Sequence, residues 1–212
     1  MIRVLLVDGQ QMFREGVSSC LSQATDICVV GQAGTIAEAL ELIPSVEPTI
    51  VTFDVRLPDG AGADLARRVR EQWPLIKLVT LTGYDYTEYV RAMLRASVDG
   101  YILKSASHQS LFDALREVAA GGLVLPPQIA AKVMRGSSTS MAAHIAREPD
   151  ALTLRELEVM ELVHQGLRNG EISQNLSIST RTVEAHVSNI VSKMGARNRT
   201  DAFRIAQEQH LL

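Results

Sequence analysis

The segment Ile50–Gly60 constrains the fold of the first half of this chain more than any other segment. It is an apolar, largely β-branched run that delivers one carboxylate, Asp54, to the point where Pro58 and Gly60 break the run. A continuous apolar run of this length is typical of a strand buried on both faces of a parallel sheet. An Asp here could simply open a turn. It also stands where open α/β sheets place their ligands, so the neighbouring elements decide between the two interpretations.

Apolar runs alternate with amphipathic helical patterns through the first 120 residues. The predicted strands are Arg3–Val7, Ile27–Gln32, Ile50–Asp54, Leu78–Thr82 and Gly100–Leu103. The predicted helices are Phe13–Leu21, Ala37–Ile43, Ala63–Glu71, Thr87–Ala96 and Ser107–Ala120. Pro44 is expected to end the second helix, because proline removes a helical hydrogen bond. This strict alternation predicts an α/β doubly wound domain over residues 1–120, built on a five-stranded parallel sheet.

The pattern changes after residue 120. Residues 121–148 are predicted to be a linker, because 135–149 are rich in Gly, Ser, Thr and Ala and lack a strong apolar period. Residues 149–212 show helical spacing alone and predict a small all-α domain. Its four helices are expected at Arg155–His164, Asn169–Asn175, Thr180–Lys193 and Thr200–Gln209. Thr153 and Glu156 have the spacing of a capping box at the first of them.

Composition favours a globular protein with no membrane partner. The chain has 212 residues, 46% of them hydrophobic, and a mean hydropathy of +0.07. No apolar run reaches the roughly 18 residues of a membrane span. The apolar run near the N-terminus, Ile2–Val7, is too short for a signal peptide. Cys20 and Cys28 form no Cys-x-x-Cys pair, so we expect reduced, buried thiols in a cytoplasmic protein.

The charge distribution excludes binding to nucleic acid through bulk charge. The whole chain has a formal net charge of −3, and residues 149–212 carry seven basic and eight acidic side chains. Any contact with DNA must therefore depend on where individual charges are placed.

Four polar side chains stand at the ends of predicted strands: Asp8, Asp54, Thr82 and Lys104. Parallel strands all point the same way, so these groups are expected to converge at one edge of the sheet. Mg²⁺ prefers oxygen ligands from one or two carboxylates together with phosphate oxygens. An aspartate can accept a phosphoryl group, whose oxygens a hydroxyl and an ammonium can then hold. The four together predict a phosphoryl-accepting site.

Residues 1–120 resemble the receiver domain of two-component response regulators. The resemblance rests on Asp8, on Asp-Val-Arg-Leu-Pro at 54–58, on Leu-Thr-Gly at 81–83 and on Tyr-Ile-Leu-Lys at 101–104. It implies that Asp54 is the phosphoacceptor, Thr82 and Tyr101 a switch pair, and Lys104 the phosphate-binding cation. It also implies a Mg²⁺ site made by Asp8, Asp54 and the backbone carbonyl of Arg56.

Gly9 departs from the receiver pattern, which has a second acidic residue directly after the first. In the family that second acid is a direct metal ligand, whereas here Gly9 is followed by Gln10 and Gln11. Without the second acidic residue, the pocket holds only the carboxylates of Asp8 and Asp54 against the ammonium of Lys104, so its attraction for a divalent cation is weaker. The sequence therefore predicts weak Mg²⁺ binding and inefficient phosphorylation.

The second half of the chain resembles the LuxR-type helix-turn-helix domain. The segments that carry the resemblance are Leu152–Val159, Gln165–Ile172, Thr180–Val187 and Lys193–Thr200. Together the two halves resemble the NarL/FixJ family of response regulators. The resemblance implies a homodimer that binds double-stranded DNA and a sensor histidine kinase upstream.

The predicted helix Thr180–Lys193 has the two faces that a recognition helix needs. Val183, Val187 and Ile190 share an apolar face that is expected to pack inward. The residues expected to enter the major groove from the other face are Arg181, Glu184, Ala185 and Ser188. The expected phosphate contacts are Arg181, Lys193, Arg197 and Arg199.

We therefore expect a DNA-binding regulator and not an enzyme, with a receiver that controls a helix-turn-helix domain through dimerisation. Two alternatives stay open at this point. The receiver could act without phosphorylation, so that expression level, dimerisation or a ligand sets the output. Alternatively, the chain could be a phosphate sink or a protein-interaction module that does not bind DNA.

Overall fold

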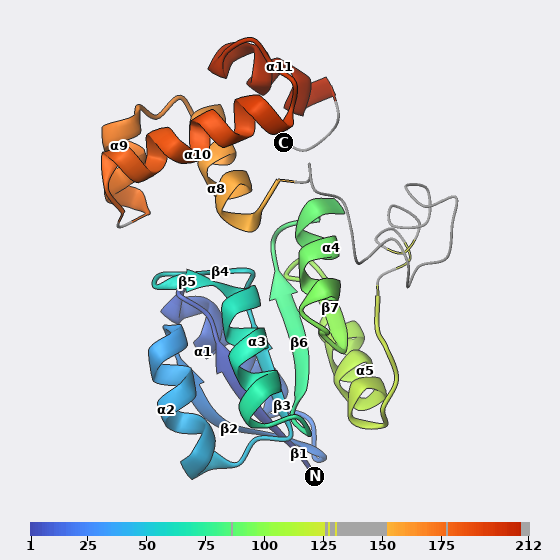
Figure 1. Ribbon diagram of the computed structural model, residues 1–212. Helices are drawn as coiled ribbons and strands as arrows, with labels where there is room; N and C mark the ends of the chain where they lie inside the picture. The colour runs from blue at the N-terminus through green and yellow to red at the C-terminus, as the bar shows by residue number, and fades with distance from the viewer. Residues whose placement is uncertain (86, 126, 128–129, 131–151, 177, 209–212) are drawn as a thin grey trace. The chain divides into compact units, whose positions relative to one another are not determined.

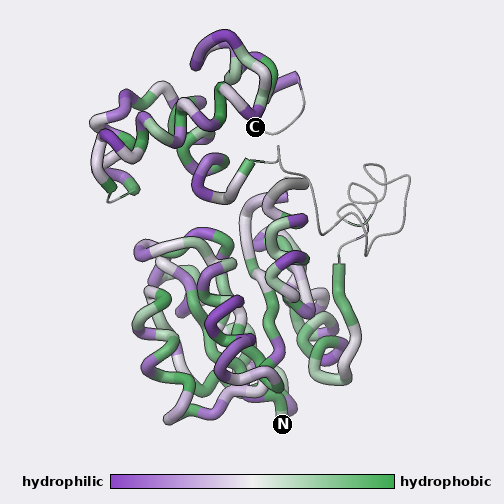
Figure 2. The backbone as a smooth tube through the Cα atoms, in the orientation of Figure 1, coloured by the Kyte–Doolittle hydropathy of each residue, from purple (hydrophilic) through white to green (hydrophobic). Residues whose placement is uncertain are grey.

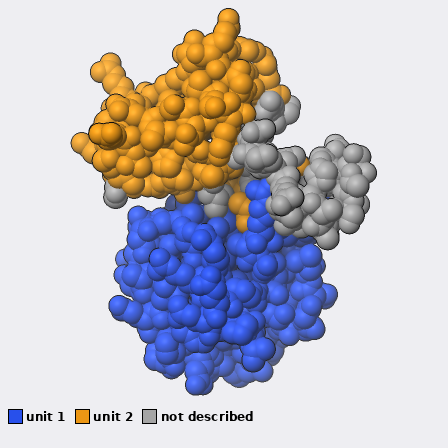
Figure 3. All heavy atoms as spheres, viewed as in Figure 1, with its two compact units in different colours: residues 1–85, 93–136 blue, residues 86–92, 137–212 orange. Residues whose placement is uncertain are grey.

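The computed structural model describes residues 1–85, 87–125, 127, 130, 152–176 and 178–208. The chain divides into two compact units, which Figure 3 shows in different colours. Unit 1 comprises residues 1–85 and 93–136, and unit 2 comprises residues 86–92 and 137–212. Most of the predicted linker, residues 131–148, lies outside the described residues.

Unit 1 is built on a five-stranded sheet (Figure 1). In spatial order its strands are β2 (Ile27–Ala33), β1 (Ile2–Val7), β3 (Ile50–Phe53), β6 (Lys77–Thr82) and β7 (Gly100–Leu103). All four neighbouring pairs are parallel, which confirms the predicted parallel sheet. The chain order reverses at β1, which lies between β2 and β3. In open α/β sheets, ligands bind outside the carboxyl ends of the strands at such a reversal.

Helices cover both faces of this sheet. Helices α1 (Gln11–Leu21) and α5 (His108–Ala119) pack on one face, and α2 (Ile36–Val46) and α3 (Gly62–Gln72) pack on the other. Figure 2 shows apolar strands between helices that alternate polar and apolar residues. The core between the sheet and helices α1 and α5 includes Val4, Leu6, Leu21, Ile50, Val79, Ile102, Leu115 and Val118. The doubly wound architecture is thus confirmed. Helix α4 (Thr87–Arg95) follows β6 and is divided between the two units.

A tight hairpin positions the chain directly after Asp54. It consists of β4 (Arg56–Leu57) and β5 (Gly60–Ala61), which pair antiparallel. Helix α3 begins immediately afterwards at Gly62, which lies against the end of β3. A Cβ atom at Gly62 would stand 2.2 Å from the carbonyl oxygen of Asp54, so this approach requires glycine.

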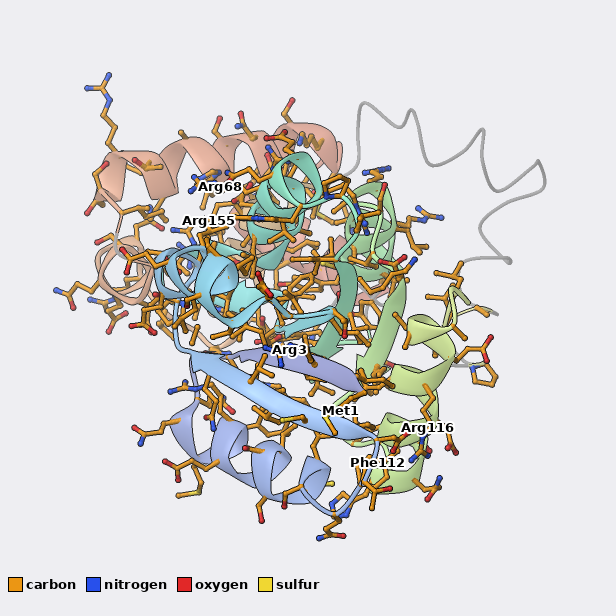
Figure 4. All side chains as sticks on the ribbon, turned by 90° about the horizontal axis from the view of Figure 1, so that it is seen from below. Met1, Arg3, Arg68, Phe112, Arg116 and Arg155 are labelled. Carbon is orange, nitrogen blue, oxygen red and sulfur yellow. The ribbon has the colours of Figure 1, made fainter. Side chains whose placement is uncertain are left out.

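Helix α2 does not end before Pro44, as the sequence predicts, but continues to Val46. Proline already has a helical φ, so near the C-terminus it removes only one helical hydrogen bond. Arg3, labelled in Figure 4, donates to the carbonyl oxygens of Val46 at 2.6 Å and Glu47 at 3.1 Å. A cation at this end satisfies carbonyl groups that the helix leaves unpaired.

Two further expectations need correction. Cys20 is buried, but Cys28 is exposed, because it lies on β2 at the edge of the sheet. The sheet unit also extends past residue 120, where the linker was expected to begin. Val124 pairs in parallel with Gly100 on β7, and its carbonyl oxygen accepts a hydrogen bond of 2.9 Å from the Tyr101 amide.

The C-terminal part of unit 2 contains helices α8 (Leu154–His164), α9 (Asn169–Asn175), α10 (Thr180–Lys193) and α11 (Arg199–Glu208). Helix α10 contacts the other three. Its apolar face is inward as predicted, with Val183 and Ile190 buried. The capping box of Thr153 and Glu156 is confirmed at the start of α8. Within the described part of the chain, no helix is both long enough and apolar enough to cross a membrane.

Candidate functional site

The four polar groups predicted at the strand ends meet beyond the carboxyl ends of β1, β3, β6 and β7. The Nζ atom of Lys104 lies 2.6 Å from Oδ2 of Asp8 and 2.7 Å from Oδ2 of Asp54. The hydroxyl of Thr82 donates a 2.6 Å hydrogen bond to Oδ1 of Asp54. Both oxygens of the Asp54 carboxylate are therefore held in place by neighbouring donors.

This pocket is largely buried and carries one excess negative charge. Asp8 is 5% exposed and Asp54 is 8% exposed. Burial by itself lowers the pKa of Lys104, but hydrogen bonds to Asp54 and Asp8 outweigh it, so the pKa is raised. The ammonium also lies 4.3 Å from the centre of the Phe13 ring, a cation–π contact. Lys104 is thus charged at neutral pH, and with two carboxylates the net charge is −1.

Backbone contacts hold Asp8, and a proline ring closes the space beside it. The Gln10 amide donates to Oδ1 of Asp8 at 2.8 Å, and the Arg14 guanidinium donates to the Asp8 carbonyl oxygen. At Gly9, where receivers have their second acid, a Cβ atom would meet Cγ and Cδ of Pro58 at 3.0 Å. Any side chain at Gly9 would have to displace this ring slightly. The sequence contains no signal for that contact.

Tyr84 connects the hairpin after Asp54 with strand β7. The hydroxyl of Tyr101 donates a 2.6 Å hydrogen bond to the Tyr84 carbonyl oxygen. Arg56 donates to the Tyr84 hydroxyl at 2.9 Å, with its guanidinium carbon 5.7 Å from the ring centre. Tyr101 is fully buried, and burial together with the Asp54 charge raises its pKa above the usual range. Sequence reasoning singled out Arg56 and Tyr101 but missed Tyr84.

The pocket has the oxygen chemistry that Mg²⁺ requires but few charged ligands. Among the described residues, no cluster of three or more His, Cys, Asp or Glu side chains could hold a metal ion. Asp8 and Asp54 together with a backbone carbonyl fit a hard cation that keeps several water ligands. Lys104 already neutralises half of the carboxylate charge in the same space.

Helix α10 presents a polar face to solvent on the side opposite its packed face. Its exposed residues include Arg181, Glu184, Ala185 and Ser188. The turn before α10 joins it to α9, and Ser179 caps α10 by accepting a 3.1 Å hydrogen bond from the Thr182 amide. This helix–turn–helix arrangement leaves the N-terminal half of α10 open to a partner.

Two of the predicted phosphate contacts, Lys193 and Arg199, are held inside the helical unit, and a third, Arg197, is paired but exposed. Lys193 forms a 2.7 Å ion pair with Glu156, whose side chain is 3% exposed. Arg199 donates to the side chain of Asn169 at 2.7 Å and also to a backbone carbonyl. Arg197 pairs with Asp201 at 3.0 Å, and this hydrogen bond raises its pKa, although its side chain stays 85% exposed. Of the cations predicted to contact phosphates, Lys193 and Arg199 therefore have structural roles, whereas Arg197 is exposed.

A doubly wound domain with this pocket, joined to a helix-turn-helix unit, defines the class of two-domain regulators that couple a receiver to a DNA-binding domain. Residues 4–116 match the response regulator receiver domain, and residues 150–206 match the LuxR family of bacterial regulatory proteins. The chain belongs to the response regulators that carry a LuxR-type DNA-binding domain.

Known relatives cover nearly the whole chain. The response regulator VraR of Staphylococcus aureus is 35% identical over 211 residues, 100% of this chain and 99% of VraR. The uncharacterized transcriptional regulatory protein YxjL of Bacillus subtilis is 35% identical over 206 residues, 97% of this chain and 94% of YxjL. The crystal structure of the response regulator ChrA is 32% identical, with a TM-score of 0.56 over 100% of this chain and 98% of ChrA. A structure of RcsB from Salmonella typhimurium shares the fold at 20% identity, with a TM-score of 0.70 over 98% of this chain and 97% of RcsB.

Proposed function

We propose that this protein is a cytoplasmic transcription regulator that binds double-stranded DNA as a homodimer and is modulated at Asp54. The observation that carries the DNA-binding part is the exposed polar face of α10 opposite the buried Val183 and Ile190. A helix of this kind fits the major groove with its N-terminal residues at the base edges. We assign residues 1–124 to the receiver, because Val124 still pairs with its sheet, the chain from there to residue 148 to the linker, and residues 149–212 to the DNA-binding domain.

Dimeric binding follows from the small number of cations available in one helical domain. Lys193 and Arg199 are engaged inside the domain, which leaves Arg181 and Arg197 among the exposed cations. Two copies on neighbouring half-sites would combine their contacts and bind far more tightly than one.

Asp54 is the phosphoacceptor in this proposal, and a sensor histidine kinase is the donor. An Asp54 oxygen attacks phosphorus and forms a P–O bond, while the P–N bond of the phosphohistidine breaks and the imidazole nitrogen takes a proton. Lys104 and Thr82, which now bind the two Asp54 oxygens, transfer their hydrogen bonds to the phosphoryl oxygens. Mg²⁺ held by Asp8, Asp54 and the Arg56 carbonyl would neutralise charge on the phosphoryl group.

The proposed Mg²⁺ site can be tested by restoring, at Gly9, the second acidic residue that receivers have at this position. Gly9→Asp should raise Mg²⁺ affinity at least about tenfold, because a unit negative charge about 4 Å from a divalent cation contributes up to about 8 kcal/mol near a protein surface, part of which desolvation offsets. Labelling of Asp54 by acetyl phosphate or a phosphoramidate should accelerate in parallel. Gly9→Ala is the matched control, since it meets the Pro58 ring in the same way without adding charge. Equal Mg²⁺ affinity in the two variants would contradict the metal assignment.

A second candidate is a regulator that binds DNA without phosphorylation. It is favoured by Gly9 and by the pairing of Lys104 with both carboxylates, which leaves a net charge of only −1 for a divalent cation. In that case Asp54→Asn should bind DNA nearly as well as the wild type. Rapid Mg²⁺-dependent labelling of the wild type, combined with loss of DNA binding in Asp54→Asn, would establish the phosphorylated form as the active one.

A gel shift at low and at moderate salt tests DNA binding itself. Contacts to phosphates release counterions, so the affinity should fall steeply as salt rises. A chain that binds no duplex even at low salt would instead be a phosphate sink or a protein-interaction module.

A further inference from the structure

Glu184 differs from the neighbouring acidic side chains of the helical unit in its surroundings. The buried carboxylates of Glu156, Glu158 and Asp201 each pair with a cation at 2.6–3.0 Å, and exposed Glu208 pairs with Arg204 at 2.5 Å. Glu184 is exposed on α10, and within residues 152–176 and 178–208 its side chain has no ion pair or hydrogen bond. Glu184 therefore has no structural role that accounts for its charge.

The position of Glu184 on α10 places its charge on the part of the helix that would face the base edges of bound DNA. Glu184 is the fifth residue of α10 and Arg181 is the second, so the two lie three residues apart on the same exposed face. The N-terminal residues of a recognition helix contact base edges, while phosphates line the groove on both sides. A carboxylate there is repelled by the phosphates, and a hydrogen bond accepted from a base offsets this repulsion.

The chemistry of the major groove selects one base. An ionised carboxylate only accepts hydrogen bonds, and the base donors in this groove are the amino groups of cytosine N4 and adenine N6. In an A·T pair the donor N6 lies between two acceptors, adenine N7 and thymine O4, which repel a carboxylate, whereas in a C·G pair the donor N4 has an acceptor, guanine O6, on one side only. We infer that Glu184 is a specificity-determining residue that accepts a hydrogen bond from a cytosine amino group. This inference rests on the proposed DNA-binding function.

The test uses the full-length protein and a pool of randomised duplexes. The wild type is first used to select the sequences that bind. Duplexes are then made that carry each of the four base pairs in turn at every selected position. Their affinities are measured for the wild type, Glu184→Gln and Glu184→Ala. At one position the wild type should prefer C·G about 5- to 100-fold. Glu184→Gln should prefer A·T there, because glutamine pairs with adenine N6 and N7, and Glu184→Ala should show no preference.

Glu208→Gln is the matched control, because it removes the same charge from the exposed end of α11. It should leave the base preference at every position unchanged. Glu184 makes no ion pair or hydrogen bond with the other described residues, so thermal unfolding of both Glu184 variants should match the wild type.

The experiment distinguishes failure of the Glu184 inference from failure of the proposed DNA-binding function. If Glu184→Gln and Glu184→Ala bind all selected duplexes more tightly by the same factor, with the wild-type order of preference, Glu184 only repels DNA and the inference is overturned. If the wild type enriches no sequence and binds no duplex at low salt, the proposed DNA-binding function fails as well.

Discussion

Replacing Lys104 with methionine should reveal how strongly the acidic pocket depends on its internal cation. The ammonium lies 2.6 Å from Asp8 and 2.7 Å from Asp54, and the three side chains are only 7–16% exposed. Removing one partner of a buried ion pair usually costs about 3–5 kcal/mol, because a buried charge is left uncompensated. Methionine preserves the length and apolar character of the stem, so the loss reports mainly on charge.

The Lys104→Met variant should therefore lose about 3–5 kcal/mol of stability at neutral pH. Burial lowers the pKa of Lys104, but its hydrogen bonds to Asp54 and Asp8 outweigh burial and raise the pKa in the folded protein. A cation whose folded-state pKa is raised stabilises the fold below its unfolded-state pKa, and this contribution is lost as the pH rises through the folded-state pKa. The contribution of Lys104 should therefore be lost only at alkaline pH.

Urea unfolding followed by tryptophan fluorescence measures this loss in the receiver unit alone, because Trp73, the single tryptophan of the chain, lies directly after α3. Lys77→Met is the matched control. Lys77 pairs with Asp99 at 3.1 Å, but Asp99 keeps a 2.8 Å bond to Arg70, so the control should lose about 1 kcal/mol or less. A loss below about 1 kcal/mol in Lys104→Met at neutral pH would refute the reasoning.

Three further predictions concern the DNA-binding unit. Lys193→Met should lower the thermal unfolding temperature of this unit, followed by circular dichroism, because Glu156 would lose its cation; an unchanged temperature would mean that Lys193 serves DNA alone. The double variant Arg181→Ala, Ser188→Ala should fold normally and bind its operator more weakly, by about 1–3 kcal/mol for each lost contact, and a wild-type footprint would contradict this. Footprints should show a repeat with a period of about 10 base pairs, and tight binding of a monomer to a single half-site would argue against the dimer.

The sequence by itself determined the architecture and most of the acidic pocket. Runs such as Ile50–Phe53 are mostly apolar on both faces, a pattern typical of a covered parallel strand. Because parallel strands end at the same edge, Asp8, Asp54 and Lys104 could be placed together before any distance was known. The two faces of α10 were equally predictable, since helical periodicity depends on the local chain alone.

Only the tertiary structure decided which polar groups pair. Lys193 reaches Glu156 from 37 residues away, and Tyr84 lies 28 residues from Arg56 and 17 from Tyr101. The contact between Gly9 and Pro58 likewise depends on how the hairpin after Asp54 folds over the end of β1. Periodicity reports which face of an element is buried, but an ion pair or hydrogen bond also requires donor and acceptor to meet within about 3 Å. That meeting depends on how distant segments pack, which no local pattern in the sequence encodes.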